Sequence, residues 1–266
     1  MSIFAPLMNP IRFYPVSSLP DFQDTFPFVD RMVTQQQWIE GMYPTNFYKD
    51  FLVNKEIRLQ FRLSGITNKK IIVTKPDGSE QTLNETEITP AGWISTDVYK
   101  YSFTPTVEGV YYFTFTEPNY KSDKIYVSSL EKFRRRLIEI EYYNSENDYF
   151  MIFYNGALQK YTGLTYFTGQ LLTGQPENEI SGYDSDRGEL KKLRSTPKRI
   201  SNLMLTDVHM AYVDVINMIF SCDNLTINGV TFQSSEAPQV EDIAKSDLVN
   251  ISVKLTQTNN DYRVIE

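Results

Sequence analysis

The stretch LIEIEYYNSENDYFMIFYNG, residues 137–156, decides the fold. Its first part alternates apolar residues with Glu139 and Glu141, and this period of two puts one face of a strand in a core and the two carboxylates in solvent. Residues 144–148 are rich in turn formers, and residues 149–154 are apolar or aromatic at every position. The stretch therefore predicts a β-hairpin whose second strand is buried on both faces, which requires a second layer of structure above it.

The composition favours β structure. The chain has 266 residues, of which 41% are hydrophobic and 14% aromatic, with 18 Tyr and 17 Phe. Aromatic side chains suit pleated surfaces and interfaces. The net charge of -7 argues against a general nucleic-acid-binding surface but leaves a local basic patch open. The single cysteine, Cys222, rules out an intramolecular disulfide framework.

Targeting signals are not evident in the sequence. The first ten residues lack the basic segment and the apolar core of a secretory signal peptide. No apolar run approaches the roughly 18 residues that cross a bilayer. We therefore expect a protein that is made in the cytoplasm and has no membrane anchor.

Residues 1–42 differ from the rest and predict an extended N-terminal arm. Prolines block both helix and interior strand, and the aromatic residues between them need a surface to cover. Two interpretations stay open: the arm wraps its own domain, or it lies on a neighbouring subunit. The prolines of the arm are Pro6, Pro10, Pro15, Pro20 and Pro27.

Residues 43–130 predict an immunoglobulin-like β-sandwich. Short alternating segments recur with turns about every ten residues, one of them at Pro76-Asp77-Gly78. The cysteine pair of antibody domains is absent, so the prediction concerns architecture alone. The expected strands cover residues 57–63, 71–74, 81–88, 98–103, 110–115 and 124–127.

Residues 131–266 predict a second β-rich domain with one short α-helix, so the fold class is mainly β. The apolar face of residues 207–220 recurs at helical spacing, with Thr206 or Asp207 as the cap. Asn228-Gly229 is a strong hairpin signal, and residues 249–255 alternate as a closing strand. Glycines make residues 158–182 look rich in turns, and residues 182–199 read as a charged turn between strands.

Few residues offer catalytic chemistry, so we expect no enzyme and no cofactor. His209, the one histidine, lies in the predicted helix, where a surface or half-buried position is expected. One histidine and one cysteine exclude histidine-based triads and zinc sites with several such ligands. Only a carboxylate mechanism, such as that of a glycosidase, stays open.

A calcium loop is also not expected. Asp184, Asp186 and Gly188 resemble part of an EF-hand loop, but the position before the glycine is Arg187, whose guanidinium would repel the cation. No metal site is therefore predicted.

The charge distribution points to one candidate site. Residues 187–199 contain six basic residues against one acid, whereas residues 200–266 contain three basic and nine acidic residues. Ordinary surface mixing is one explanation. Another is that the basic patch of one subunit meets the acidic region of the next, and a third is that it lines a channel for DNA without sequence specificity. The candidate subunit-contact residues are Arg187, Lys191, Lys192, Arg194, Lys198 and Arg199.

Four segments in this order carry a family resemblance: YPTNFYKDFLVNKEIRLQF (43–61), IEIEYYNSENDYFMIFY (138–154), GYDSDRGELKKLRSTPKR (182–199) and VINMIFSCDNLTINGV (215–230). The chain resembles virion structural proteins of tailed phages infecting Bacteroides, including the crAss-like group. The resemblance implies a non-enzymatic subunit of the tail or of the ring-shaped tail hub in the head–tail region. Its partners would be further copies of itself and other virion proteins, and its location the virion.

A different class of function stays open beside this one. Exposed Trp38, Trp93 or tyrosines of a β-sandwich would stack on sugars, which is the property of a carbohydrate- or surface-binding module.

Overall fold

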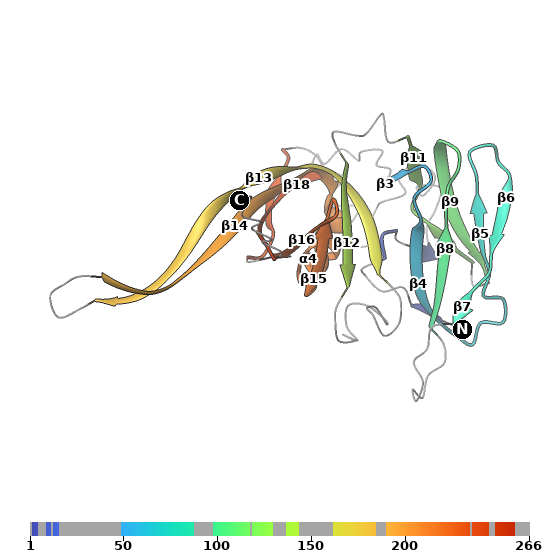
Figure 1. Cartoon of the computed structure of the whole chain (residues 1–266). Coiled ribbons are helices and arrows are strands. Elements are labelled where there is room, and N and C mark those ends of the chain that lie inside the picture. The colour runs from blue at the N-terminus through green and yellow to red at the C-terminus, as the bar shows by residue number, and fades with distance from the viewer. Residues whose placement is uncertain are drawn as a thin grey trace, which may run out of the picture.

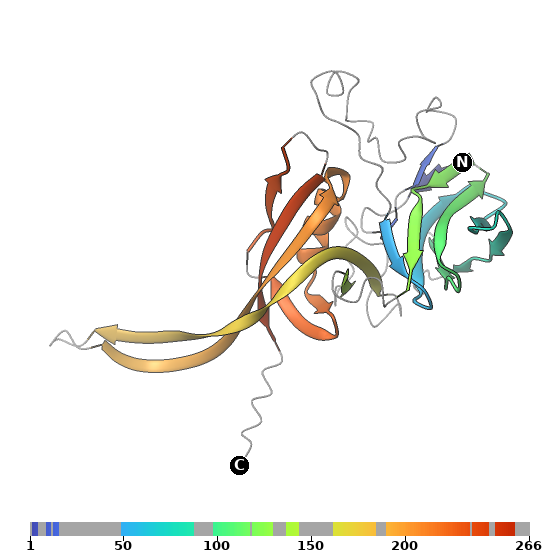
Figure 2. The same cartoon turned by 90° about the horizontal axis from the view of Figure 1, so that it is seen from above.

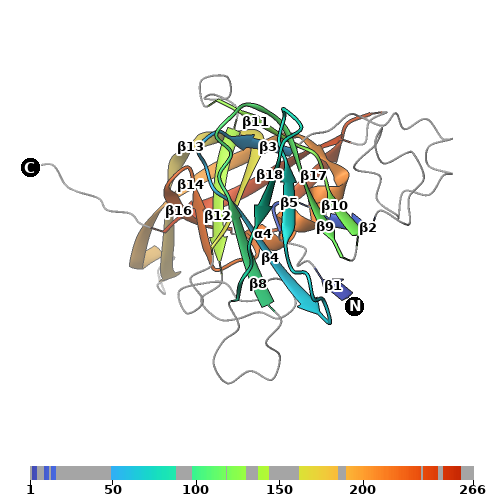
Figure 3. The same cartoon turned by 90° about the vertical axis from the view of Figure 1, so that its right-hand side faces the viewer.

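The computed structural model of the chain describes residues 2–4, 9–11, 13–15, 49–87, 98–117, 119–129, 137–143, 162–184, 190–234, 236–244 and 248–258. These residues are mainly β-strand, as the sequence predicts. Figures 1 and 2 show two groups of strands side by side, with a long two-stranded extension on the far side of the second group. Figure 3 looks along the line that joins the groups, with the first group nearer the viewer.

The first group is an immunoglobulin-like β-sandwich of two sheets. The described strand pairs are antiparallel, apart from β3, which runs parallel to β11. One sheet has the order β1 (Ser2–Phe4), β4 (Ile57–Ser64), β8 (Val98–Phe103), β7 (Thr86–Glu87). The other has the order β2 (Phe13–Pro15), β10 (Asn119–Ser122), β9 (Gly109–Thr116), β11 (Ile125–Ser128), β3 (Lys49–Leu52), and β5 (Ile71–Thr74) joins β9 to β6 (Glu80–Leu83).

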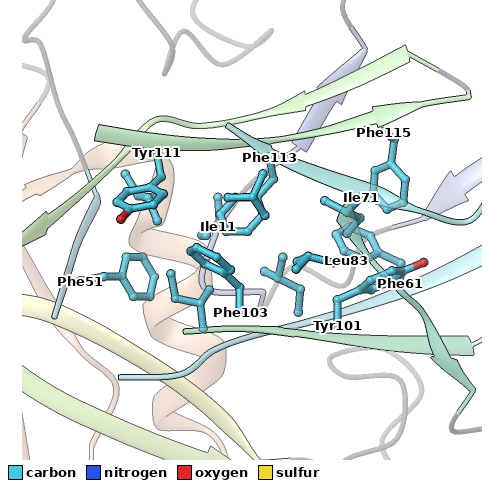
Figure 4. Close-up of a cluster of buried hydrophobic side chains, with 14 of the residues drawn as sticks. Ile11, Phe51, Phe61, Ile71, Leu83, Tyr101, Phe103, Tyr111, Phe113 and Phe115 are labelled. Atoms are coloured by element: carbon cyan, nitrogen blue, oxygen red, sulfur yellow. The ribbon is translucent and has the colours of Figure 1, made fainter. Parts of the chain in front are cut away.

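Alternating side chains from both sheets fill the sandwich core (Figure 4). In β4 the apolar positions from Ile57 to Leu63 are each at most 1% exposed. Phe61 meets Phe115 of the facing sheet edge-to-face, with ring centroids 5.0 Å apart and an interplanar angle of 85°. Such aromatic pairs contribute about 0.5–1.5 kcal/mol beyond the burial of their area. The aromatic-rich composition thus stabilises a core between two layers.

Most of the sandwich strands lie where the sequence predicts them. The expected strands at 71–74 and 98–103 coincide with β5 and β8, and the other expected strands overlap β4, β9 and β11. The expected strand at 81–88 is two short strands, β6 and β7, and residue 88 is outside the described range. The Pro76-Asp77-Gly78 turn is confirmed, because Gly78 has a φ of 81° and its N–H donates to the Lys75 carbonyl over 2.9 Å.

The second group is a sheet that closes on itself. Its order is β14 (Leu190–His209), β13 (Gly163–Asp184), β12 (Leu137–Tyr143), β15 (Asn224–Ile227), β16 (Val230–Ser234), β18 (Leu248–Gln257), β17 (Gln239–Asp242). Because β14 also pairs with β18, the strands β14, β13, β12, β15, β16 and β18 form a closed ring of six paired strands. We call this part the closed sheet. Closure removes the free edges that would otherwise bind other strands.

The helix of this region is shorter than predicted. The 3-10 turn η2 (Met210–Tyr212) leads into α4 (Val213–Phe220), whose buried side packs on the core of the closed sheet. The prediction of a helix from 207 with a cap at Thr206 or Asp207 is wrong at its start. There β14 bulges, Asp207 has a φ of 55°, and the strand resumes opposite β18 as far as His209. His209 is therefore a buried strand residue, 3% exposed, and not a surface residue of a helix.

The strand at the start of the deciding stretch is confirmed, but its predicted hairpin partner is wrong. β12 buries Ile138, Ile140 and Tyr142, as the alternation predicts. Its neighbours are β13 on one edge and β15 on the other, so both edges of residues 140–142 are occupied. Residues 149–154 lie outside the described residues. The pairing of β12 thus joins strands distant in sequence.

The described part of the N-terminal arm packs on its own chain. β1 pairs with β4, and β2 pairs with β10. Between them Asn9 exchanges two hydrogen bonds with the backbone of Gln60, at 2.8 and 3.0 Å, and Ile11 is completely buried. Residues 2–4, 9–11 and 13–15 therefore follow the first of the two interpretations, and residues 16–48 lie outside the described range.

Candidate assembly interface

A two-stranded ribbon projects from the closed sheet. β13 has 22 residues and β14 has 20, both far longer than the typical strand of about 5–6 residues. β13 pairs with β12 only as far as Thr168, and β14 pairs with β18 only as far as Ile200. Beyond these points residues 175–184 and 190–199, which we call the ribbon, have described pairings only with each other. Figures 1 and 2 show the ribbon extending away from every other described element.

The ribbon overturns two predictions about this region. The described residues of the glycine-rich stretch, 162–182, are not mainly turns, because β13 begins at Gly163. The described residues of the charged segment, 182–184 and 190–199, belong to the strands β13 and β14. The glycines instead lie near a shift in strand register and where neighbouring strands approach closely. The register shifts between Leu172 and Gln175, and a Cβ on Gly174 would lie 2.9 Å from the Ile200 carbonyl oxygen. Glycine is therefore required for close approach at a bulge.

The structure places five of the six candidate contact residues on one strand. Lys191, Lys192, Arg194, Lys198 and Arg199 belong to β14, and Arg187 lies outside the described residues. Arg199 is exposed. From Leu190 to Arg199 there are five basic residues and no acid, whereas residues 175–184 of β13 contain three acids, Glu177, Glu179 and Asp184, and no base. The two strands of the ribbon therefore carry opposite charge.

A groove with a mixed polar and apolar lining lies at the root of the ribbon. It has a volume of about 350 Å³, and its wall includes residues 236–239 and side chains of β13, β14 and β18. Leu172 and Met204 are 38% and 44% exposed there. The Lys254 ammonium forms an ion pair with Glu236 over 3.4 Å across the groove. Two exposed apolar side chains are ordinary on a protein surface, so the groove by itself does not define an interface.

A second hollow lies at one end of the sandwich, with a volume of about 580 Å³. Its aromatic residues, Phe103 and Tyr111, are 5% and 1% exposed, and the Tyr111 hydroxyl donates to the Val107 carbonyl over 2.7 Å. Neither ring presents the open face that stacks on a sugar. Trp38 and Trp93, the tryptophans of the carbohydrate-binding alternative, lie outside the described residues.

A buried lysine joins the sandwich to the closed sheet. Lys49 of β3 is 1% exposed, and its ammonium donates to the Tyr166 carbonyl and lies 3.0 Å from the centroid of the Phe167 ring. Burial holds the pKa of Lys49 well below its usual value, although the Asp50 carboxylate opposes this shift. Burial also raises the pKa of Asp50 to about 6, against the opposing charge of Lys49.

Ion pairs surround this junction. The Lys55 ammonium lies 3.0 Å from Glu139, and the Arg58 guanidinium lies 3.3 Å from Glu141. The Tyr166 hydroxyl donates to Glu139 over 3.0 Å. The expectation that Glu139 and Glu141 face solvent is therefore wrong: both are half-buried against the sandwich and are held by cations. This arrangement serves to position the two groups of strands, not to present a free pair of carboxylates.

The described residues contain neither a metal-binding cluster nor a membrane-spanning helix. Among the described residues no three His, Cys, Asp or Glu side chains are grouped closely enough to hold a metal ion. Asp186 and Gly188 of the calcium-like segment are outside the described range. No helix in the described part of the chain has the length and apolar character needed to cross a bilayer.

The comparisons with known proteins identify no family. No protein-family model matches the sequence, and no curated protein matches it. The crystal structure of bovine butyrophilin is similar over 82% of this chain and 85% of its own, at 9% identity and a TM-score of 0.17. That TM-score is too low to support an inference about function.

Sequence reasoning identified the basic residues of the ribbon but missed the ribbon itself. It also missed the acidic strand opposite them and Lys49, a charged residue that gave no sign of burial. Leu203 and Leu205 alternate with polar or exposed residues, and this alternation could have predicted a strand at the root of the ribbon.

Proposed function

We propose that this protein is a non-enzymatic structural subunit that assembles with copies of itself into a ring. The observation that carries the proposal is the ribbon, a pair of long strands that projects from a well-packed body. An isolated two-stranded hairpin is at best marginally stable in water, because neither face is covered by a second layer. A partner that covers the ribbon would supply the contacts that the ribbon lacks in the single chain.

The identity of the assembly follows from the family resemblance of the sequence. Virion proteins of tailed phages infecting Bacteroides are built into the tail or the head–tail hub, and the ring proposed here belongs to that part of a virion. The protein is made in the host cytoplasm and functions in the particle. Other virion proteins are its further partners, and DNA passing through the ring is contacted without sequence specificity.

The scaffold architecture agrees with a structural role. The sandwich and the closed sheet are joined by Lys49 and by the hydrogen bond from the Tyr212 hydroxyl to Asp123, at 2.9 Å. Both residues of that hydrogen bond are completely buried. A junction fixed in this way holds the ribbon at a defined angle to the sandwich, and a ring requires the same angle in every copy.

Native mass measurement of the purified protein tests the proposal. The wild-type chain is expected to form a discrete oligomer at micromolar concentration, visible as rings by electron microscopy. In a shortened variant, residues 176–199 are replaced by Asn-Gly, which joins the paired residues Gln175 and Ile200 through a two-residue turn. This variant is expected to remain monomeric with an unchanged circular dichroism melting curve. A wild-type chain that stays monomeric at all concentrations, alone and with phage lysate, would refute the proposal.

A further inference from the structure

The two strands of the ribbon differ in charge, and each has one edge without a described partner. Over residues 175–184 and 190–199 no described strand pairs with the outer edge of β13 or of β14. The outer edge of β13 carries only acidic charge, and that of β14 only basic charge. A free strand edge presents unpaired backbone N–H and C=O groups that another strand can bind.

We propose that the acidic edge of β13 in one copy pairs with the basic edge of β14 in the next copy. This inference rests on the proposed function and names the contact through which the ring forms. When neighbouring ribbons point the same way, β13 of one copy and β14 of the next run in opposite directions, so the new pairing is antiparallel. Opposite charges then face each other across the contact and stabilise it.

The charge pattern excludes the symmetric alternatives. Two β14 edges would bring five basic residues against five others, and two β13 edges would bring three acids against three. Like charges directly across a strand pair are destabilising. The contact is therefore head-to-tail, and a head-to-tail contact closes into a ring when the rotation between copies allows it.

The prolines limit the length of the pairing. Pro176 and Pro197 lack an N–H, and both lie in the half of the ribbon nearer to the closed sheet. The pairing is thus confined to the outer half, approximately residues 178–184 and 190–196. Prolines and lysines also occur on strand edges that stay unpaired, where they prevent association. The experiment must separate these two roles.

Two charge-reversed variants distinguish an edge that pairs with a neighbouring copy from an edge that stays unpaired. Neither variant changes a charged pair within the ribbon of one copy. Glu179 and Asp184 stand opposite the uncharged residues Thr196 and Leu190 within the ribbon, so the acid-reversed variant is E179K/D184K. Lys192 and Arg194 stand opposite Gly182 and Ser181, so the base-reversed variant is K192E/R194E. The matched control is E241K/D242K on β17, an exposed acidic strand of the closed sheet.

Each reversed variant alone is expected to need about 10-fold or more protein for half-maximal assembly at low salt. Mixed in equal amounts, the two variants are expected to assemble again, because every contact then joins opposite charges. The chain that combines all four substitutions is also expected to assemble, and E241K/D242K to behave as wild type.

Each contrary result has a distinct meaning. If the wild-type chain assembles and both reversed variants assemble equally well, the edge contact is refuted while the proposed function stands. If E241K/D242K loses assembly and E179K/D184K does not, the basic strand meets the closed sheet of the neighbour, and the edge contact is again refuted. If the wild-type chain never assembles, the proposed function itself fails.

Discussion

The ribbon and the sandwich are both built from antiparallel strands, yet they depend on different kinds of contact. Strands of the sandwich bury one face against a second sheet, and its largest aromatic side chains are completely enclosed. Strands of the ribbon are longer, carry charge of one sign each, and have described pairings only with each other. The sandwich is therefore stabilised within one chain, whereas under the proposed function the ribbon is stabilised by a second chain. Local strand pattern alone does not distinguish these two cases.

The first prediction compares a substitution in the core of the sandwich with one in the ribbon. Phe61 is completely buried and meets rings from both sheets, so Phe61→Ala is expected to lower the free energy of unfolding by about 3–5 kcal/mol. Ile180→Ala in the ribbon is expected to change it by less than about 0.5 kcal/mol. Urea unfolding measures Phe61→Ala in the monomeric shortened variant, and Ile180→Ala, a residue which that variant lacks, in the full-length monomeric E179K/D184K variant. Equal effects would show that the ribbon belongs to the folded core.

The second prediction concerns the place where the ribbon leaves the closed sheet. A Cβ on Gly169 would lie 2.3 Å from the Met204 carbonyl oxygen, so Gly169→Ala forces a backbone shift and is expected to cost about 1–3 kcal/mol. At Gly174 a Cβ would lie 2.4 Å from Cγ of Arg199, and its nearest backbone contact is the Ile200 carbonyl oxygen at 2.9 Å, a smaller backbone overlap than at Gly169. Gly174→Ala is therefore expected to cost less. Thermal unfolding of the two variants gives the order, and the reverse order would contradict the described register.

The third prediction concerns the buried lysine at the junction. The folded-state pKa of Lys49 is well below that of the unfolded chain, so the unfolded state binds more protons between the two values and stability rises with pH there. The slope from this one group approaches about 1.4 kcal/mol per pH unit. Lys49→Met is expected to remove that slope between pH 8 and 10, above the titration of Asp50 near 6.

Urea unfolding at several pH values provides the measurement for Lys49. The control is Lys55→Met, which removes an exposed cation from the same junction. A difference in stability between the wild type and Lys49→Met that stays constant from pH 8 to 10 would show that Lys49 keeps its charge in the folded protein.

The smallest effect is expected at the edge of the junction. The Lys55–Glu139 ion pair is 48% and 34% exposed, and exposed pairs contribute about 0–1 kcal/mol. Lys55→Ala should therefore lower stability by at most about 1 kcal/mol, and 0.5 M NaCl should reduce the difference. A larger, salt-independent loss in chemical denaturation would mean that the junction depends on this pair more than its exposure indicates.

The sequence predicts those elements whose pattern is local. The alternation in β4 and the Asn228-Gly229 turn, where φ is 49° and 81°, need no distant information. The partner of β12 was mispredicted because strand pairing across more than 80 residues leaves no local pattern. The ribbon was missed because glycines and prolines that mark turns elsewhere, such as Gly174 and Pro197, here mark a bulge and a strand edge.

The candidate site was likewise predicted from the sequence only where the evidence is local. Charge composition identified the basic residues from Lys191 to Arg199, since charge can be counted without a structure. Their alignment beside Glu177, Glu179 and Asp184 depends on the register of β13 and β14, which only the structure provides. The burial of Lys49 likewise arises from the packing of the closed sheet on the sandwich.

Hydrogen exchange of the ribbon amides tests the central claim most directly, because it reports the stability of the ribbon in each state of assembly. The exchange of residues 175–199 is measured by mass spectrometry in the assembled wild-type protein and in the monomeric E179K/D184K variant, with the sandwich strands as internal reference. We expect the ribbon to exchange slowly in the assembly and rapidly in the monomer, while the sandwich is protected equally in both. Equal protection of the ribbon in monomer and assembly would contradict it.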